Sequence, residues 1–112
     1  MVIKPSPAVY RSEELKRLLA SLDSAHEFNK WINDMEIALK WNMFAGDSIP
    51  KRQIPACYID QYGVNALYRY DHPRGFRSCY VLLKYEGIGV CPLIVDLMTH
   101  DEYTTRFGYK KS

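Results

Sequence analysis

A change of hydrophobic period near Gly46 is the feature that most restricts how this chain can fold. Before it, apolar residues recur at the three- and four-residue spacing of one helical face. They form two stripes, the first made of Leu15, Leu18, Leu19 and Leu22 and the second of Phe28, Trp31, Ile32, Met35 and Leu39. The pattern predicts two amphipathic helices joined by a short break, a helical hairpin within about residues 7–45.

Candidate helix ends accompany both stripes. Ser6 and Pro7 suit an N-cap and a first helical position. Ser24 and Glu27 have the spacing of a capping box before the second helix. Gly46 is a natural stop for that helix.

After Gly46 the pattern becomes strand-like. Pro50 and Pro55 predict irregular chain first, and three runs rich in apolar and β-branched or aromatic residues follow, "VNALYRY", "FRSCYVLLKY" and "IGVCPLIVDLM". Short connections between them predict an antiparallel meander within about residues 64–98. A further short strand is expected at "VIK" near the start. The predicted fold is α+β, one domain over residues 1–112, with an N-terminal helical hairpin packed on a small, mostly antiparallel sheet.

Composition restricts the class of protein. Hydrophobic residues make up 47% of the 112 residues and charged residues 25%, a globular balance that argues against disorder. No signal peptide and no apolar run of membrane-spanning length is visible, so we expect a cytoplasmic protein. Three cysteines without a CxxC pair predict free thiols, with Cys79 and Cys91 buried in apolar runs. The formal charge of +2 is weak for a nucleic-acid binder.

Residues able to move protons and hold phosphates crowd the closing stretch, "THDEYTTRFGYKKS". In an antiparallel meander the start of the middle strand and the end of the last strand meet at one sheet edge, so Arg77 should lie near this stretch. Cleavage of RNA by its own 2′-hydroxyl needs a base, an acid and positive charge for the phosphorane. Candidates for these roles are Arg77, Arg69 on the preceding strand, His100, whose side-chain type titrates near neutral pH, and Tyr103, which could stack on a base.

Each of these residues also has a structural interpretation. His100 could be an exposed or helix-capping histidine, Tyr103 could serve packing alone, and Arg106 could form a surface salt bridge. In the "DHPRG" turn, solvent exposure is the favoured interpretation of His72 and Arg74.

The second half of the chain resembles the RelE/ParE superfamily of toxins from type II toxin–antitoxin modules, and its RelE-like branch most closely. The resemblance is carried by "YGVNALYRY", "GFRSCYVL" and "HDEYTTRFGY", in this order, and covers roughly residues 47–109. It implies that Arg77 is the phosphate-stabilising arginine and Tyr103 the stacking tyrosine, with His100 at a position where members carry a basic residue.

The resemblance also implies a function. We expect an endoribonuclease that cleaves mRNA, free or on the ribosome, and so inhibits translation and arrests growth. The catalytic residues would be Arg77, His100 and Tyr103, and the substrate-binding residues Arg69, Arg106, Tyr109 and Lys110. No metal or other cofactor is expected, because arginine supplies the positive charge.

A protein partner is expected as well. The resemblance implies a cognate antitoxin that neutralises the toxin, in a complex such as a heterotetramer, and Tyr58, Tyr62 and Tyr68 are candidate contacts. The alternative is a non-enzymatic member of the superfamily: a gyrase-directed toxin, or a protein that only binds an antitoxin and represses its own operon. The weak charge favours this alternative, and the His100, Tyr103 and Arg106 cluster favours the nuclease.

Overall fold

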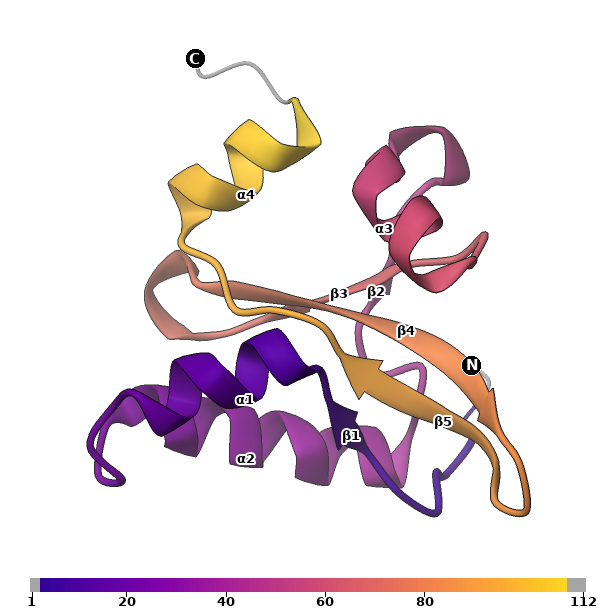
Figure 1. Cartoon of the computed structure of the whole chain (residues 1–112), viewed down its shortest axis with the longest axis horizontal. Coiled ribbons are helices and arrows are strands. Elements are labelled where there is room, and N and C mark those ends of the chain that lie inside the picture. Colours follow the sequence, from indigo (N-terminus) through magenta and orange to yellow (C-terminus); the bar gives the residue numbers. More distant parts are fainter. Residues whose placement is uncertain (1–2, 109–112) are drawn as a thin grey trace.

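The computed structural model describes residues 3–108, in which helices cover both faces of a mixed sheet (Figure 1). The helices are α1 (Glu13–Ala20), α2 (Glu27–Trp41), α3 (Ala56–Tyr62) and α4 (His100–Phe107). The α+β class is therefore confirmed, as is a helix pair before Gly46. The expected two-layer arrangement is wrong, because α3 and α4 form a third layer on the sheet face opposite α1 and α2.

The sheet has the order β1-β5-β4-β3-β2. Its strands are β1 (Tyr10–Arg11), β2 (Asp47–Ser48), β3 (Tyr68–Asp71), β4 (Arg77–Tyr85) and β5 (Gly89–Ile94). The meander of β3, β4 and β5 is antiparallel, as predicted, whereas β1 adds to β5 in parallel. Asp71 lies opposite Arg77 in the register, and Arg69 lies opposite Cys79. Because side chains alternate between faces, these four residues share the face that α4 covers.

Two hydrophobic clusters fill the spaces between the layers. Between the sheet and the pair α1 and α2, the fully buried Tyr80 and Ile94 pack against the leucines of α1 and the apolar stripe of α2. On the other face, Cys79 and Val81 pack against Tyr58 of α3 and Tyr103 of α4. The predicted helical stripes and strands therefore supply the first cluster, and α3 and α4 complete the second.

The first helix begins later than the sequence suggested. Ser12, not Ser6, is its N-cap: the Ser12 hydroxyl accepts a hydrogen bond from the Leu15 N–H and donates one to the Val95 carbonyl. The chain before Ser12 is used for β1, which delays the helix, and residues 3 and 4 are not in a strand. Likewise His26 rather than Ser24 caps α2, since its Nδ1 accepts from the Phe28 N–H.

Gly46 has a packing role rather than the predicted role of helix stop. The helix ends at Trp41, with Asn42 as its cap. A Cβ at Gly46 would lie 2.5 Å from the Arg69 carbonyl oxygen and 2.8 Å from Cε1 of Tyr80. Only glycine allows the backbone to approach β3 and Tyr80 so closely.

Two further expectations fail in the second half. Residues 56–62 form α3 rather than irregular chain, and Tyr58 is buried, so it is not an exposed aromatic. The last strand ends at Ile94 instead of continuing to residue 98, because the side chain of Asp96 takes part in a hydrogen-bond network with residues of the sheet and of α4.

Cys79 and Cys91 are buried free thiols, as expected. Between residues 3 and 108, none of the helices has the length and apolar character needed to cross a membrane.

His72 is buried, which corrects the expectation of an exposed turn histidine. It precedes the turn between β3 and β4, with only 8% of its surface exposed. Its Nε2 lies 2.7 Å from the Ser78 hydroxyl, and its ring stacks on Trp31. Burial lowers the pKa of His72 from 6.5 to about 4, although the charges of Asp71 and Asp34 oppose the shift.

This burial predicts an acid-sensitive fold. The unfolded chain takes up the His72 proton near pH 6.5 and the folded chain only near pH 4. The unfolded state therefore binds more protons between these values, and acidification through this window should cost about 3 kcal/mol of unfolding free energy. Urea unfolding at pH 7 and at pH 4 measures the loss, and His72→Gln should remove most of it. An equal loss in the variant would contradict the assignment.

Candidate functional site

Two arginines meet an aromatic ring between the sheet and α4. Arg69 of β3 and Arg77 of β4 place their guanidinium carbons 5.7 and 4.7 Å from the ring centroid of Tyr103. Both arginine side chains are largely covered, with 26% and 22% of their surfaces exposed. The backbone of Arg77 also pairs with Met98, just before α4. The predicted proximity of Arg77 to the closing stretch is therefore confirmed.

Carboxylates accompany this arginine pair. Oδ1 of Asp71 lies 3.0 Å from Nε of Arg69 and 3.8 Å from Nε of Arg77. Asp47 of β2 also contacts Arg69, with Oδ2 at 3.3 Å from Nη2. Burial lowers the pKa of Arg69, but the hydrogen bond with Tyr103 and the charges of Asp71 and Asp47 outweigh it and raise the pKa. The guanidinium is thus firmly protonated.

Tyr103 lies inside the protein rather than on its surface. Its exposed fraction is 1%, and its ring stacks on Phe107 at a centroid distance of 4.2 Å. In this arrangement neither face of the ring is open to a nucleobase, contrary to the stacking role suggested from the sequence. The ring instead makes cation–π contacts with the guanidinium groups of Arg69 and Arg77.

His100 is held at the start of α4. Thr99 caps this helix in a capping box with Glu102, which fixes the position of its first turn. The His100 side chain is exposed, and the turn between β3 and β4 comes close to it: a Cβ built on Gly75 would lie 3.4 Å from the His100 Cβ. His100 therefore lies on the same side of α4 as the strand ends that carry Arg77.

Arg106 belongs to a separate hydrogen-bonded group, with Asp96 and Tyr58. Its Nη1 donates to Oδ2 of Asp96 at 3.0 Å and to the Tyr58 hydroxyl at 3.1 Å. The Tyr58 hydroxyl donates to Asp96 Oδ2 at 2.6 Å, and the Cys79 N–H donates to Oδ1 at 2.9 Å. Both oxygens of this buried carboxylate are thus satisfied by three separate elements. The salt-bridge interpretation of Arg106 is the one the structure bears out.

The environment of this group shifts its pKa values. Burial raises the pKa of Asp96, against the lowering effect of Tyr58, the Cys79 N–H and Arg106. Burial and the Asp96 charge raise the pKa of Tyr58 so that it keeps its proton. Burial alone would lower the pKa of Arg106, but Tyr58 and Asp96 raise it. The charges are those expected of a structural ion pair with a hydroxyl donor.

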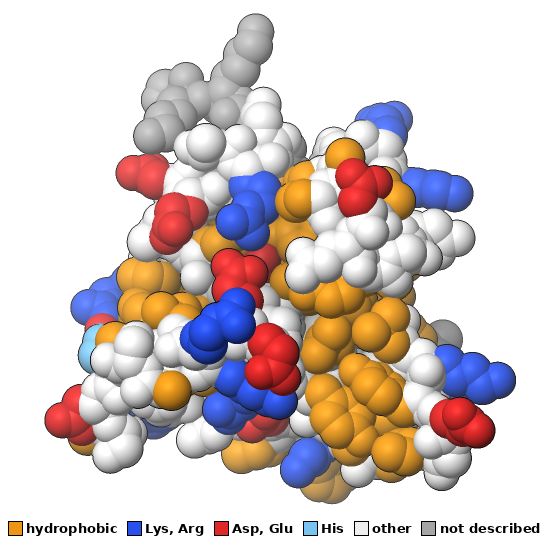
Figure 2. Space-filling model, in the orientation of Figure 1, with side chains coloured by type: hydrophobic (Ala, Val, Ile, Leu, Met, Phe, Trp, Pro, Cys, Tyr) orange, Lys and Arg blue, Asp and Glu red, His pale blue; other side chains and the backbone are white. Residues whose placement is uncertain are grey.

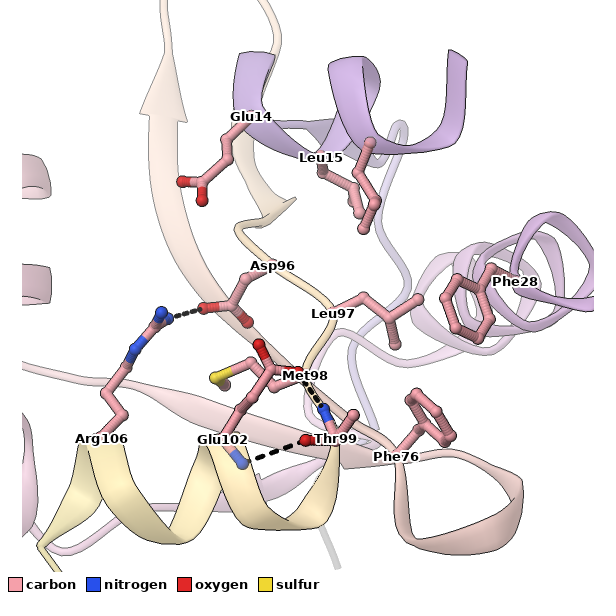
Figure 3. Close-up of a pocket in the computed structure, with 11 residues that line it drawn as sticks. Glu14, Leu15, Phe28, Phe76, Asp96, Leu97, Met98, Thr99, Glu102 and Arg106 are labelled. Atoms are coloured by element: carbon pink, nitrogen blue, oxygen red, sulfur yellow. Dashed lines mark hydrogen bonds and ion pairs between the residues drawn. The ribbon is translucent and has the colours of Figure 1, made fainter. Parts of the chain in front are cut away.

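A cavity of about 410 Å³ adjoins this group (Figure 3). One side is apolar and includes Leu15, Phe28 and Phe76. On the other side Glu14 points towards the Asp96–Arg106 ion pair. The cavity lies between α1 and α4. Among the residues that the structure describes, no group of three or more His, Cys, Asp and Glu side chains is arranged to hold a metal ion.

The structure thus divides the predicted site residues. It brings together Arg69, Arg77 and Tyr103, with His100 at the adjacent helix start, and it places Arg106 with Asp96. Tyr109 and Lys110 lie outside the described residues.

Sequence reasoning overlooked two acids. Asp96 had a visible signal, since it is the one charged residue in the apolar run "VCPLIVDLM". Asp71 had a weaker one, because it follows Arg69 at the two-residue spacing of a shared strand face.

No family model, no curated protein and no solved structure matches this chain. Membership of the RelE/ParE superfamily therefore stays a prediction.

The Asp96 group predicts a specific stability effect. Arg106→Met removes the ion-pair partner and should cost about 2 kcal/mol of unfolding free energy, because a buried carboxylate is left uncompensated. Adding Asp96→Asn to Arg106→Met should recover part of this loss, since the buried charge is then gone. Denaturant unfolding of the single and double variants measures both effects. A double variant no more stable than Arg106→Met would argue against a charge-based cause.

Proposed function

We propose that the chain is a RelE-like toxin that cleaves mRNA without a metal ion, and that Arg69 and Arg77 hold the scissile phosphate. The observation that carries the proposal is the pair of guanidinium groups supported by one buried aromatic ring, with the exposed His100 at the start of the helix that carries this ring. Two planar cations fixed in place are suited to an oxyanion, because their donors need little rearrangement as charge accumulates.

The reaction follows from RNA chemistry. The ribose 2′-oxygen attacks the adjacent phosphorus, loses its proton to a base, and expels the 5′-oxygen, which takes a proton from an acid. The products are a 2′,3′-cyclic phosphate and a 5′-hydroxyl. Arg77 and Arg69 would stabilise the phosphorane, and His100 would carry out one of the two proton transfers.

Tyr103 receives a different role from the one the resemblance implies. Because its ring is buried beneath the arginines, it would act as a positioning residue instead of a stacking one. Arg106 would contribute by fixing α4 to the sheet through Asp96, and only indirectly to RNA binding.

A non-enzymatic member of the superfamily is the second candidate. It is favoured by the structural use of Tyr103 and Arg106, which leaves fewer free groups for catalysis than the sequence suggested. Such a protein would use the same arginines only to bind. The two candidates differ in the products: only the nuclease leaves cyclic phosphate ends.

Arg77→Ala should lower the rate of mRNA cleavage by ~10²–10³, the usual effect of losing one preorganised charge donor. Arg52→Ala is the matched control, because it removes an exposed arginine of the short turn Lys51–Gln53, outside the group of Arg69, Arg77 and Tyr103. Primer extension on translated messages, with analysis of the end groups, measures cleavage, and melting curves exclude unfolding. Equal cleavage by Arg77→Ala and the control would refute the role of Arg77. Binding of RNA without any cleavage by the unmodified protein would favour the non-enzymatic candidate.

The proposal includes an antitoxin partner. Half-buried hydrophobic side chains, including Tyr10, Tyr62 and Leu83, border the second core cluster, and the Tyr10 and Tyr85 rings lie 4.4 Å apart. Figure 2 shows hydrophobic side chains gathered on this side of the molecule, over β1 and β5. A surface of this kind is suited to an apolar partner segment.

Co-expression with the product of a neighbouring gene should therefore yield a stable complex. Tyr85→Lys should weaken it, because a charge would enter the apolar contact. Trp41→Lys should not, although Trp41 is 75% exposed, because it lies at the end of α2 below the sheet. Pull-down from cells producing both proteins measures the complex. A complex equally sensitive to both changes would place the partner elsewhere.

A further inference from the structure

One carboxylate occupies the space between the two arginines. Asp71 ends β3 directly opposite Arg77 and two residues after Arg69, so all three side chains project from one face. Its Oδ1 lies 3.0 Å from Arg69 Nε and 3.8 Å from Arg77 Nε. A carboxylate and a phosphodiester are both monoanions with two acceptor oxygens, and both pair with guanidinium groups. Asp71 therefore lies where an RNA phosphate would bind.

Both arginines have contacts other than those with Asp71. Both rest on the Tyr103 ring, and Arg69 also has the hydrogen bond with Tyr103 and the ion pair with Asp47. The Asp71 side chain is 55% exposed, and it lies beside the turn that leads to β4. It can leave the arginines by rotating into solvent, and they remain supported.

The contact with Asp71 is also incomplete. Arg69 Nη2 donates one long hydrogen bond of 3.5 Å to Asp71 Oδ2, but the buried Nε of Arg69 makes no hydrogen bond although Asp71 Oδ1 is 3.0 Å away. Buried charged donors without an acceptor are rare and call for an explanation. A ligand oxygen that replaced the Asp71 carboxylate could approach this donor in line.

We propose that Asp71 is an internal competitor for the RNA phosphate: its carboxylate occupies the Arg69–Arg77 anion site in the free protein and leaves when a phosphodiester binds. This inference rests on the proposed function, because it assumes that the arginine pair is the RNA site. It adds a regulatory element to that site, since Asp71 reduces binding to any stray phosphate that cannot displace it. Only a substrate held in place by further contacts would bind well.

The chain offers a matched control for the test. Asp71→Asn and Asp47→Asn change the net charge equally, and each removes a carboxylate from Arg69. Only Asp71 also approaches Arg77. The probe is a fluorescent single-stranded 2′-O-methyl RNA oligonucleotide, which cannot undergo cleavage because its 2′-oxygen is blocked. Fluorescence anisotropy gives the dissociation constant over a range of salt concentrations, and melting curves confirm that each variant is folded.

Asp71→Asn should bind the probe about tenfold more tightly than the unmodified protein, since one competing charge within a few ångströms is removed. Its affinity should also fall more steeply with salt, because one more uncompensated positive charge neutralises RNA phosphate and releases the counterions bound there. Asp47→Asn should change the affinity by less than about threefold.

Equal effects of the two changes would overturn the inference, because a general charge effect would then explain them. Weaker binding by Asp71→Asn would overturn it too, since Asp71 would then be a positioning residue. Arg77→Ala separates these results from a failure of the proposed function. If Arg77→Ala binds the probe as well as the unmodified protein, the arginine pair is not the RNA site at all. If it loses binding while Asp71→Asn is unchanged, only the competitor role is lost.

Discussion

The buried carboxylate of Asp96 is the interaction on which the third layer depends. It accepts hydrogen bonds from β4 through the Cys79 N–H, from α3 through Tyr58 and from α4 through Arg106. Burying such a group is costly unless its oxygens are satisfied, so the network holds only when α3 and α4 are both in place. This requirement selects one placement of the two short helices, which have too few residues to be stable alone.

The placement of α4 in turn determines the arginine site. Tyr103 precedes Arg106 by three residues, so the two side chains lie near one face of the helix. When Arg106 reaches Asp96, Tyr103 is directed onto the sheet and becomes buried under Arg69 and Arg77. A change at Asp96 can therefore disturb the arginines without contacting them. For this reason the stability of every variant has to be measured together with its effect on the proposed function.

The sequence predicted the parts of the fold that rest on long periodic patterns. The stripes of α1 and α2 and the three central strands are confirmed, because their apolar residues directly report the buried faces. The start of α1 was misassigned because the residues before Ser12 form β1 and the Ser12 hydroxyl bonds to the Val95 carbonyl. These are tertiary contacts, which a local capping pattern does not report. The site was predicted only in part for the same reason. The proximity of Arg77 to α4 follows from meander geometry, but the burial of Tyr103 and the pairing of Arg106 depend on how α4 packs.

The weak net charge has a physical explanation in the way the cations are paired. Several arginines lie beside a carboxylate: Arg69 with Asp47 and Asp71, Arg106 with Asp96, Arg11 with Glu36 and Arg74 with Glu27. A formal charge of +2 is then compatible with a cationic site, because the neutralising carboxylates belong to the same chain. Exposed carboxylates such as Asp71 can move away from their arginines. If RNA is the ligand, its phosphate replaces a carboxylate beside the arginines instead of binding to a surface with excess positive charge. Long-range attraction would then be small, and substrate would have to be delivered by shape or by a larger assembly. Net charge therefore does not discriminate between a nuclease and a binding protein in this chain, whereas the end groups of the RNA after incubation with the protein do.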